Sequence, residues 1–331
     1  MITFDACPDW FSYTYDTGVG DWDVKFVDVK TAPTLMRKTL VLSGLIGVNF
    51  YMDLSGLDDD EKANSYMEFT INGRTERADF DPDFTSPSRG IYYGFTCHIA
   101  SIEMADEITA EFHYGDGKTV GTTYSAQEYI EDALESSDYP QDAKALVKAT
   151  ADYGHYVQAY LKEVKNWPDD KHVTIEARSE IGEAEIAAAA VGTADYTVTA
   201  NVPEGAFVRS LSYSLMMDDM VTLILSVRTE SGHALSSARI GEETLPIEGG
   251  AGGRYRVRIE NIMAHQLGNR YTIVLNAGGE NAEITVSPMS YVRTLLTASA
   301  YENNLTAKQA AAAIYQYYQA AIAYIDASKA H

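Results

Sequence analysis

The segment Tyr93–Cys97, with the sequence YGFTC, alternates apolar and polar side chains and gives the first indication of the fold. Successive side chains of a β-strand point to opposite faces, so this alternation predicts a strand with one buried face. The same pattern returns 162 residues later at Tyr255–Ile259, with the sequence YRVRI. A strand pattern that returns at so long a distance indicates an internal repeat if further matches occur at a similar offset.

Further matches follow in the same order along the chain. Glu107–Phe112 matches Arg270–Leu275 at an offset of 163 residues, and Tyr153 matches Tyr317 at an offset of 164. One or two such matches are expected by chance, but an ordered series at a nearly constant offset indicates a duplication. The sequence therefore predicts two diverged copies of one module.

Each copy is expected to place its strands first and its helices last. In the first copy, Val48–Met52 and Met67–Ile71 have the composition of strands, and Ser125 is a suitable N-cap for a short helix. A longer helix is predicted over Asp142–Val164, and its counterpart in the second copy begins near Thr306. The predicted fold class is α+β, with two related units, each a small antiparallel β-sheet or sandwich followed by two packed α-helices.

These elements predict a division of the chain into four parts. Residues 1–37 form an N-terminal extension with an added strand, and residues 38–166 form the first β-then-α repeat unit. Residues 167–195 form a linker, and residues 196–331 form the second, diverged unit. A chain of 331 residues is long enough for about two domains.

The composition is that of a globular protein with a strongly acidic surface. Hydrophobic residues make up 46% of the chain and charged residues 22%, so a core can form, while the net charge is −23. Affinity for nucleic acids comes mainly from cations that contact phosphate, so nucleic-acid binding is disfavoured. No apolar run approaches the roughly 20 residues of a membrane helix, so direct membrane insertion is not expected.

The two cysteines, Cys7 and Cys97, are too few for a disulfide framework, and whether they pair is left open. The segment Met1–Cys7 lacks the basic start and the apolar stretch of a signal peptide. Either the protein is cytoplasmic or the segment comes from a longer exported precursor.

A calcium loop is one candidate site in the first copy. Asp79, Asp81 and Asp83 alternate as carboxylates do at the start of many calcium loops. A helix–loop–helix calcium site also needs glycine at position six and glutamate at position twelve, where this chain has Phe84 and Gly90. The alternatives are a looser calcium site or a solvated acidic loop, and no metal site is expected overall.

Three tryptophans, Trp10, Trp22 and Trp167, are the candidates for ligand-binding aromatic surfaces. The alternative for each is packing against the core or capping it. No catalytic residues are predicted, because no serine-hydrolase, zinc or phosphate-loop motif is present. The glycine-rich segment Gly249–Gly253 precedes a predicted strand and is expected to be a hairpin loop.

The segments that carry the strand and helix patterns resemble a module of large exported proteins of Gram-positive gut anaerobes. The similar segments are Gly44–Met52, Met67–Gly73, Tyr93–Cys97, Met104–Ala110, Leu146–Gly154, Tyr255–Ile262, Tyr271–Ile273 and Tyr317–Tyr324. This family is uncharacterised, and its members often stand beside leucine-rich or immunoglobulin-like repeats. The resemblance covers most of residues 40–326 and implies export and surface display, with no catalytic residues to carry over.

The sequence is therefore expected to be a non-enzymatic binding or display module of a secreted or cell-surface protein, with a signal peptide outside this segment. Its partner would be a glycan or a host or cell-surface protein, and no cofactor is expected. The alternatives are a purely structural spacer and a glycan hydrolase with unrecognised carboxylates. The oligomeric state is left open.

Overall fold

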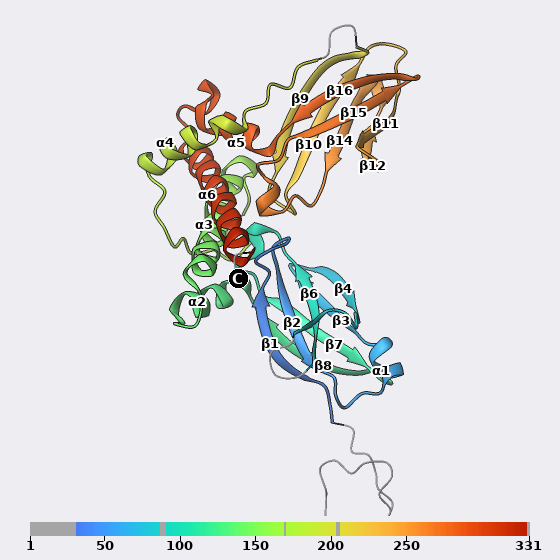
Figure 1. The fold of residues 1–331 in the computed structure, drawn as a ribbon, viewed down its shortest axis with the longest axis vertical. Helices are drawn as coiled ribbons and strands as arrows, with labels where there is room; N and C mark the ends of the chain where they lie inside the picture. The colour runs from blue at the N-terminus through green and yellow to red at the C-terminus, as the bar shows by residue number, and fades with distance from the viewer. Residues whose placement is uncertain (1–30, 87–90, 169, 203–205, 330–331) are drawn as a thin grey trace, which may run out of the picture.

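The computed structural model describes residues 31–86, 91–168, 170–202 and 206–329, and these form an α+β fold. Their sixteen strands make four antiparallel sheets of four strands each, and six α-helices accompany them. Figure 1 shows two pairs of sheets at the two ends of the molecule, with most of the helices gathered in one layer beside them. None of the helices among the described residues is long and apolar enough to span a bilayer.

The first pair of sheets has the strand orders β1-β2-β6-β5 and β4-β3-β7-β8. Its strands are β1 (Thr34–Leu40), β2 (Gly47–Asp53), β3 (Tyr66–Ile71), β4 (Arg74–Asp79), β5 (Thr85–Ser86), β6 (Tyr92–His98), β7 (Ile108–Tyr114) and β8 (Lys118–Tyr124). Phe50 of β2 meets Phe69 of β3 across the two sheets, with 5.3 Å between their ring centroids. Phe95 of β6 meets Phe112 of β7 at the same distance, so the alternating pattern buries aromatic rings between the two sheets.

The second pair of sheets has the strand orders β13-β14-β10-β9 and β12-β11-β15-β16. Its strands are β9 (Val208–Met216), β10 (Thr222–Thr229), β11 (Leu235–Ile240), β12 (Glu243–Thr244), β13 (Ile247–Gly249), β14 (Arg254–Ile259), β15 (Tyr271–Ala277) and β16 (Glu280–Val286). The two pairs of sheets have the same strand order, so that β1 to β8 of the first pair correspond in sequence to β9 to β16 of the second. Gly249–Gly253 connects β13 to β14 in an antiparallel hairpin, as the sequence predicts.

One short helix lies within the first pair of sheets, three helices lie between the two pairs, and two follow the second pair. They are α1 (Asp59–Ala63), α2 (Ala126–Glu135), α3 (Gln141–Lys165), α4 (Glu183–Gly192), α5 (Pro288–Thr297) and α6 (Leu305–Lys329). The predicted capping box at the start of α2 is confirmed: Ser125 Oγ accepts from the Glu128 amide at 3.2 Å, and the Glu128 carboxylate accepts from the Ser125 amide at 3.0 Å.

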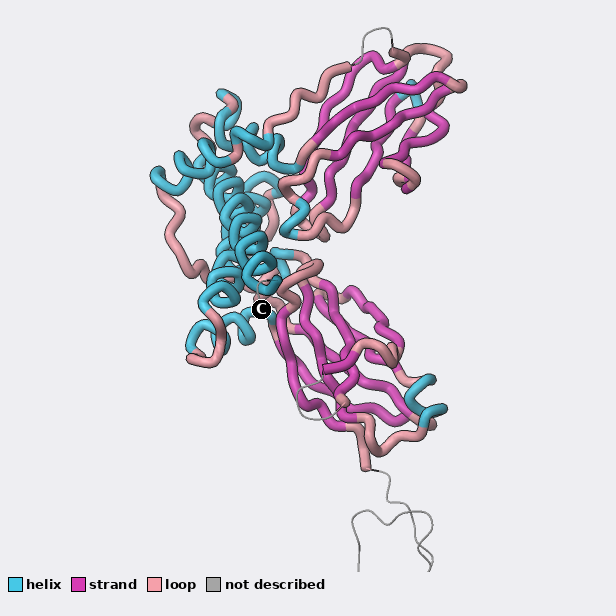
Figure 2. Tube along the Cα trace, in the orientation of Figure 1, coloured by secondary structure: helices cyan, strands magenta, loops and turns pink. Residues whose placement is uncertain are grey.

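The long helices α3 and α6 pack on each other. Tyr153 of α3 stacks on Tyr317 of α6, with ring centroids 5.0 Å apart and planes within 9° of parallel. The tube drawing in Figure 2 shows the resulting helical layer, and the colours of Figure 1 show that both halves of the chain contribute to it.

The expectation of two units, each a sheet followed by its own packed pair of helices, is wrong. The strands form four sheets, α4 is an additional helix between the halves, and α3 packs more extensively on α6 than on α2. The reason is that a three- and four-residue spacing of apolar residues shows which face of a helix is buried but does not show which element covers it. The buried face of α3 is covered in large part by a helix from the other half of the chain.

Gly154 lets α3 approach the short 3₁₀-helix η1 (Ser101–Glu103) closely. A Cβ atom at this position would lie 2.6 Å from the carbonyl oxygen of Ser101 and would also overlap Met104. Gly154→Ala is therefore expected to destabilise the protein by about 2 kcal/mol, although alanine is the better helix former by about 1 kcal/mol. Chemical denaturation measures this difference.

Gly121 provides the matched control for this substitution. A Cβ atom there would lie at an ordinary van der Waals distance of 3.7 Å from the Ala110 carbonyl oxygen. Gly121→Ala is expected to leave the free energy of unfolding within about 0.5 kcal/mol of the wild-type value, because β8 has room for the methyl group. Equal effects of the two substitutions would contradict the close approach of η1 to α3.

Candidate functional site

Buried polar side chains hold the linker that follows α3 against this helix. The carboxylate of Asp152 accepts hydrogen bonds from the amides of Arg178 and Ser179 at 2.6 and 2.8 Å. The side-chain amide of Gln158 donates to the carbonyl of Val173 at 2.8 Å. Since a buried polar group without a partner costs free energy, these contacts explain why α3 carries polar residues on a buried face.

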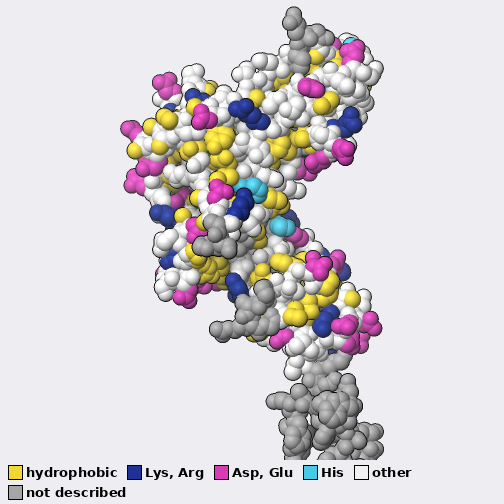
Figure 3. All heavy atoms as spheres, in the orientation of Figure 1, with side chains coloured by type: hydrophobic (Ala, Val, Ile, Leu, Met, Phe, Trp, Pro, Cys, Tyr) yellow, Lys and Arg dark blue, Asp and Glu magenta, His cyan; other side chains and the backbone are white. Residues whose placement is uncertain are grey.

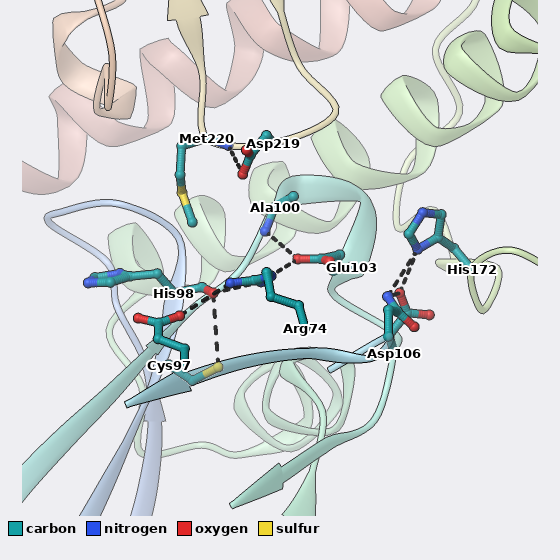
Figure 4. A network of polar contacts seen from close by, with 11 residues as sticks. Arg74, Cys97, His98, Ala100, Glu103, Asp106, His172, Asp219 and Met220 are labelled. Carbon is teal, nitrogen blue, oxygen red and sulfur yellow. Dashed lines mark hydrogen bonds and ion pairs between the residues drawn. The ribbon is translucent and has the colours of Figure 1, made fainter. Parts of the chain in front are cut away.

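His172 forms a buried pair with Asp106 at the start of this linker, and Figure 4 shows the two side chains facing each other. The Nδ1 atom of His172 lies 2.7 Å from a carboxylate oxygen of Asp106, and the two side chains are 8% and 4% exposed. Asn72 Nδ2 donates to the same oxygen at 2.6 Å, and the Val173 amide donates to the other oxygen at 2.6 Å. Three donors thus fix the position of the Asp106 carboxylate.

The pairing determines which nitrogen of His172 is available to a ligand. A carboxylate only accepts hydrogen bonds, so Nδ1 of His172 carries the proton that is donated to Asp106. The other nitrogen, Nε2, is buried and has no hydrogen-bond partner among the described residues. In the neutral imidazole this nitrogen is an acceptor, and in the imidazolium it is a donor.

A pocket of about 180 Å³ lies beside this pair. It is lined by His155, Gln158, Ala159, Lys162, Trp167, Pro168, Lys171, His172 and Thr174. The indole of Trp167 forms part of the wall, 5.3 Å from the imidazole of His172 between ring centroids. Lys171 Nζ lies 3.9 Å from the centroid of the Trp167 ring, a cation–π contact that holds this ammonium group at the pocket.

His155 is a second imidazole of the pocket wall with a defined tautomer. Its Nδ1 atom lies 2.6 Å from the carbonyl oxygen of Ile175, which only accepts, so Nδ1 is the donor. In the neutral ring the remaining nitrogen of His155 is therefore an acceptor. The pocket combines two imidazoles of fixed orientation with an aromatic wall, so it can hydrogen-bond a polar ligand that also has an apolar face.

The charge of the pocket differs from the charge of the whole chain. Two lysines, Lys162 and Lys171, line the pocket, and none of the described lining residues is an Asp or a Glu. The chain as a whole has a net charge of −23, and Figure 3 shows acidic side chains spread over both sandwiches and the helical layer. The ammonium group of Lys171 at this pocket of an acidic protein favours an anionic ligand.

A second cluster of polar residues in Figure 4 has a structural role. The Glu103 carboxylate accepts from Arg74 Nη2 at 3.0 Å and from the Ala100 amide at 2.9 Å. The second contact caps the N-terminus of η1. Arg74 also donates to the carbonyl of His98 at 3.2 Å. The neighbouring Cys97 is fully buried, and this burial raises the pKa of its thiol to about 12, so the cluster contains no reactive thiolate near neutral pH.

Of the three candidate tryptophans, Trp10 and Trp22 lie outside the described residues. Trp167 lines the pocket, is half-buried against the core and has Lys171 over its ring, while its role in ligand binding stays a prediction. Sequence reasoning did not identify Asp106 and His172. The two residues are 66 positions apart, and neither belongs to a recognisable motif, so their pairing depends on the path of the linker.

Two of the three carboxylates of the candidate calcium loop have partners within the chain. Asp79 accepts from Arg77 Nε at 2.7 Å, and Asp81 accepts from the amide of Asp83 at 2.9 Å. Among the residues that the structure describes, no group of three or more His, Cys, Asp or Glu side chains is placed to hold a metal ion. The expectation that this loop is not a metal site stays a prediction.

No protein-family model matches this sequence, and no curated protein matches it.

Proposed function

We propose that this chain is a non-enzymatic binding module of a secreted or cell-surface protein and that the pocket beside Trp167 binds an acidic sugar residue of a glycan. The observation that carries the proposal is the buried Nε2 atom of His172. This atom has no partner among the described residues, and it belongs to the ring of His172, which lines the pocket and is held in place by Asp106. A buried polar atom without a partner is costly, so a ligand that completes its hydrogen bonding gains affinity.

The size and composition of the pocket support a single sugar residue as the ligand. Its volume of about 180 Å³ is smaller than the roughly 300–1000 Å³ of pockets for drug-sized ligands. The Trp167 ring offers apolar surface to the face of a pyranose, while His155 and His172 match its hydroxyl groups. Lys171 is held where it can pair with a carboxylate on the sugar.

An internal repeat and surface display belong to the same proposal. The ordered matches along the sequence support the repeat, and so does the strand order that returns in the second pair of sheets. The repeat boundaries at residues 38–166 and 196–331 stay predictions. Export rests on the resemblance to modules of gut anaerobes.

The proposal is tested with two sugars that differ only in a carboxylate. We expect methyl glucuronide to bind the full chain and methyl glucoside to bind at least tenfold more weakly, since tenfold corresponds to about 1.4 kcal/mol. Lys171→Gln is expected to lower the affinity for methyl glucuronide by about tenfold. Isothermal titration calorimetry, or the shift of the His172 ring resonances in NMR spectra, measures both effects.

Lys329→Gln is the matched control, because Lys329 lies at the exposed end of α6 and pairs only with the neighbouring Asp326 among the described residues. It removes the same charge and is expected to leave the affinity unchanged. Equal affinities for the two sugars would contradict the role of the lysine. Absence of binding to acidic sugars of several types would overturn the proposal in favour of a spacer.

A further inference from the structure

We infer that the outer face of the sheet β13-β14-β10-β9 is a second binding site, which takes a sulfated polysaccharide chain. The inference does not rest on the pocket beside Trp167, because it concerns other residues in the second pair of sheets. The site is an open hollow of about 700 Å³. It is lined by Ser210, Leu211, Ser212, Ser226, Val227, Arg228, Glu248, Gly249, Ala251, Arg254, Tyr255 and Arg256.

The strand register brings three arginines together on this face. Arg254 and Arg256 are two residues apart on β14, so their side chains point to the same face of the sheet. Arg228 of β10 lies directly opposite Arg254, and Ser226 lies opposite Arg256. Val257 of β14 is buried between the sheets, which confirms that the arginines occupy the outward positions.

Among the described lining residues of the hollow, the three arginines outnumber the one acid, Glu248. None of Arg228, Arg254 and Arg256 forms an ion pair there, and all three are exposed. Glu248 lies opposite Arg256 in the register of β13 and β14, but its carboxylate accepts from Arg258 at 3.0 Å. Like charges directly opposite each other on neighbouring strands destabilise a sheet, so the pair Arg228 and Arg254 has a cost that an anionic ligand would offset.

Serines complete the polar floor of the hollow. Ser210 of β9 lies opposite Arg228, and Ser212 lies opposite Ser226. These side chains are short, so a ligand can approach the sheet closely, and their hydroxyls both donate and accept hydrogen bonds. The guanidinium group pairs with planar or tetrahedral oxyanions through two parallel hydrogen bonds. Alternating arginines and serines suit a chain in which anionic groups are separated by hydroxyl groups, as in a sulfated polysaccharide.

The corresponding sheet of the first half shows that the fold does not require this cationic face. On the outward side of β1-β2-β6-β5, Gly94 of β6 is covered by the ring of Phe84, which lies 5.8 Å from the ring of Tyr51. Nearby, Thr96 donates to Asn49 at 2.7 Å. Two sheets of the same strand order therefore carry a covered aromatic face in one half and an open arginine face in the other.

Nucleic acid fits this face less well than a polysaccharide does. Duplex DNA carries one negative charge per ~1.7 Å of its axis and needs many cationic contacts to bind. Three arginines on a chain with a net charge of −23 supply few such contacts. A polysaccharide with widely spaced sulfates needs fewer cations, and its hydroxyl groups can bond to the serines.

The test uses dextran sulfate as the probe and unsulfated dextran of the same length as its control, both added to the full chain. We expect dextran sulfate to bind and dextran not to bind, and we expect the affinity to fall as salt is added. The double variant Arg254→Gln, Arg256→Gln is expected to lower the affinity at least tenfold, because it removes two of the three charges.

Arg239→Gln is the matched control, since Arg239 is exposed on β11 in the other sheet of the same pair. It is expected to leave the affinity for dextran sulfate unchanged. An equal loss in the Arg239 variant would overturn the inference, because it would show a general effect of charge. Single-stranded DNA that competes at the same concentration as dextran sulfate would also overturn it.

Discussion

Tyr153→Ala is expected to lower the free energy of unfolding by about 3–5 kcal/mol, the usual cost of removing a large aromatic side chain from a core. Tyr153 is 1% exposed and stacks on Tyr317, which is 6% exposed. The substitution leaves a cavity at the contact between α3 and α6, where the two halves of the chain meet. Urea denaturation followed by circular dichroism measures the loss.

A double-mutant cycle with Tyr317→Ala tests the stacking itself. Because the two rings are in contact, the effects of the single substitutions are expected to be non-additive by about 0.5–1.5 kcal/mol. Tyr324→Ala is the control on α6, since Tyr324 is only half-buried and is expected to cost less than either core substitution. Additive effects of Tyr153→Ala and Tyr317→Ala would show that the two rings do not stabilise each other.

The same pair of tyrosines shows what could be predicted from the sequence. The match of Tyr153 with Tyr317 and the spacing of apolar residues placed both tyrosines on the buried faces of long helices. The starts of these helices were predicted within one residue, at Gln141 and Leu305. That the rings touch could not be predicted, because periodicity gives the buried face of each helix and leaves its partner open.

The candidate site was predictable only in part, for a similar reason. Trp167 was named from the sequence as a candidate aromatic surface, with packing against the core as the alternative, and it lies half-buried in the wall of the pocket. The pairing of His172 with Asp106 requires the linker to return across the end of the first pair of sheets. No local pattern specifies such a path, because buried polar contacts between distant segments depend on the assembled core.

The arginine face was accessible to sequence reasoning but was not recognised. The alternation in Tyr255–Ile259 predicted a strand, and it also places Arg256 and Arg258 on the outward side. What the sequence alone does not give is the neighbouring strand. The register that sets Arg228 opposite Arg254 turns a common alternating pattern into a cluster of like charges.

The stacked tyrosines also make the fold sensitive to alkaline pH. Burial raises the pKa of Tyr153 from 10.0 to about 12, and burial beside Tyr153 raises the pKa of Tyr317 as well. Below pH 10 the two phenols are protonated in both the folded and the unfolded state, so the free energy of unfolding does not depend on their ionisation. Above pH 10 the unfolded state releases the protons while the folded state keeps them, so stability falls as the pH rises.

Each of the two buried tyrosines is expected to contribute a loss of about 1.4 kcal/mol per pH unit between pH 10 and 12. Together they remove about 5 kcal/mol by pH 12, comparable with the whole stability of many domains. We expect cooperative unfolding in this range, with tyrosinate absorbance at 295 nm rising together with the loss of circular dichroism. Tyr153→Phe removes one ionisable group and is expected to make the loss less steep. A loss of stability that is equally steep in the wild type and in Tyr153→Phe would contradict the burial of the Tyr153 phenol.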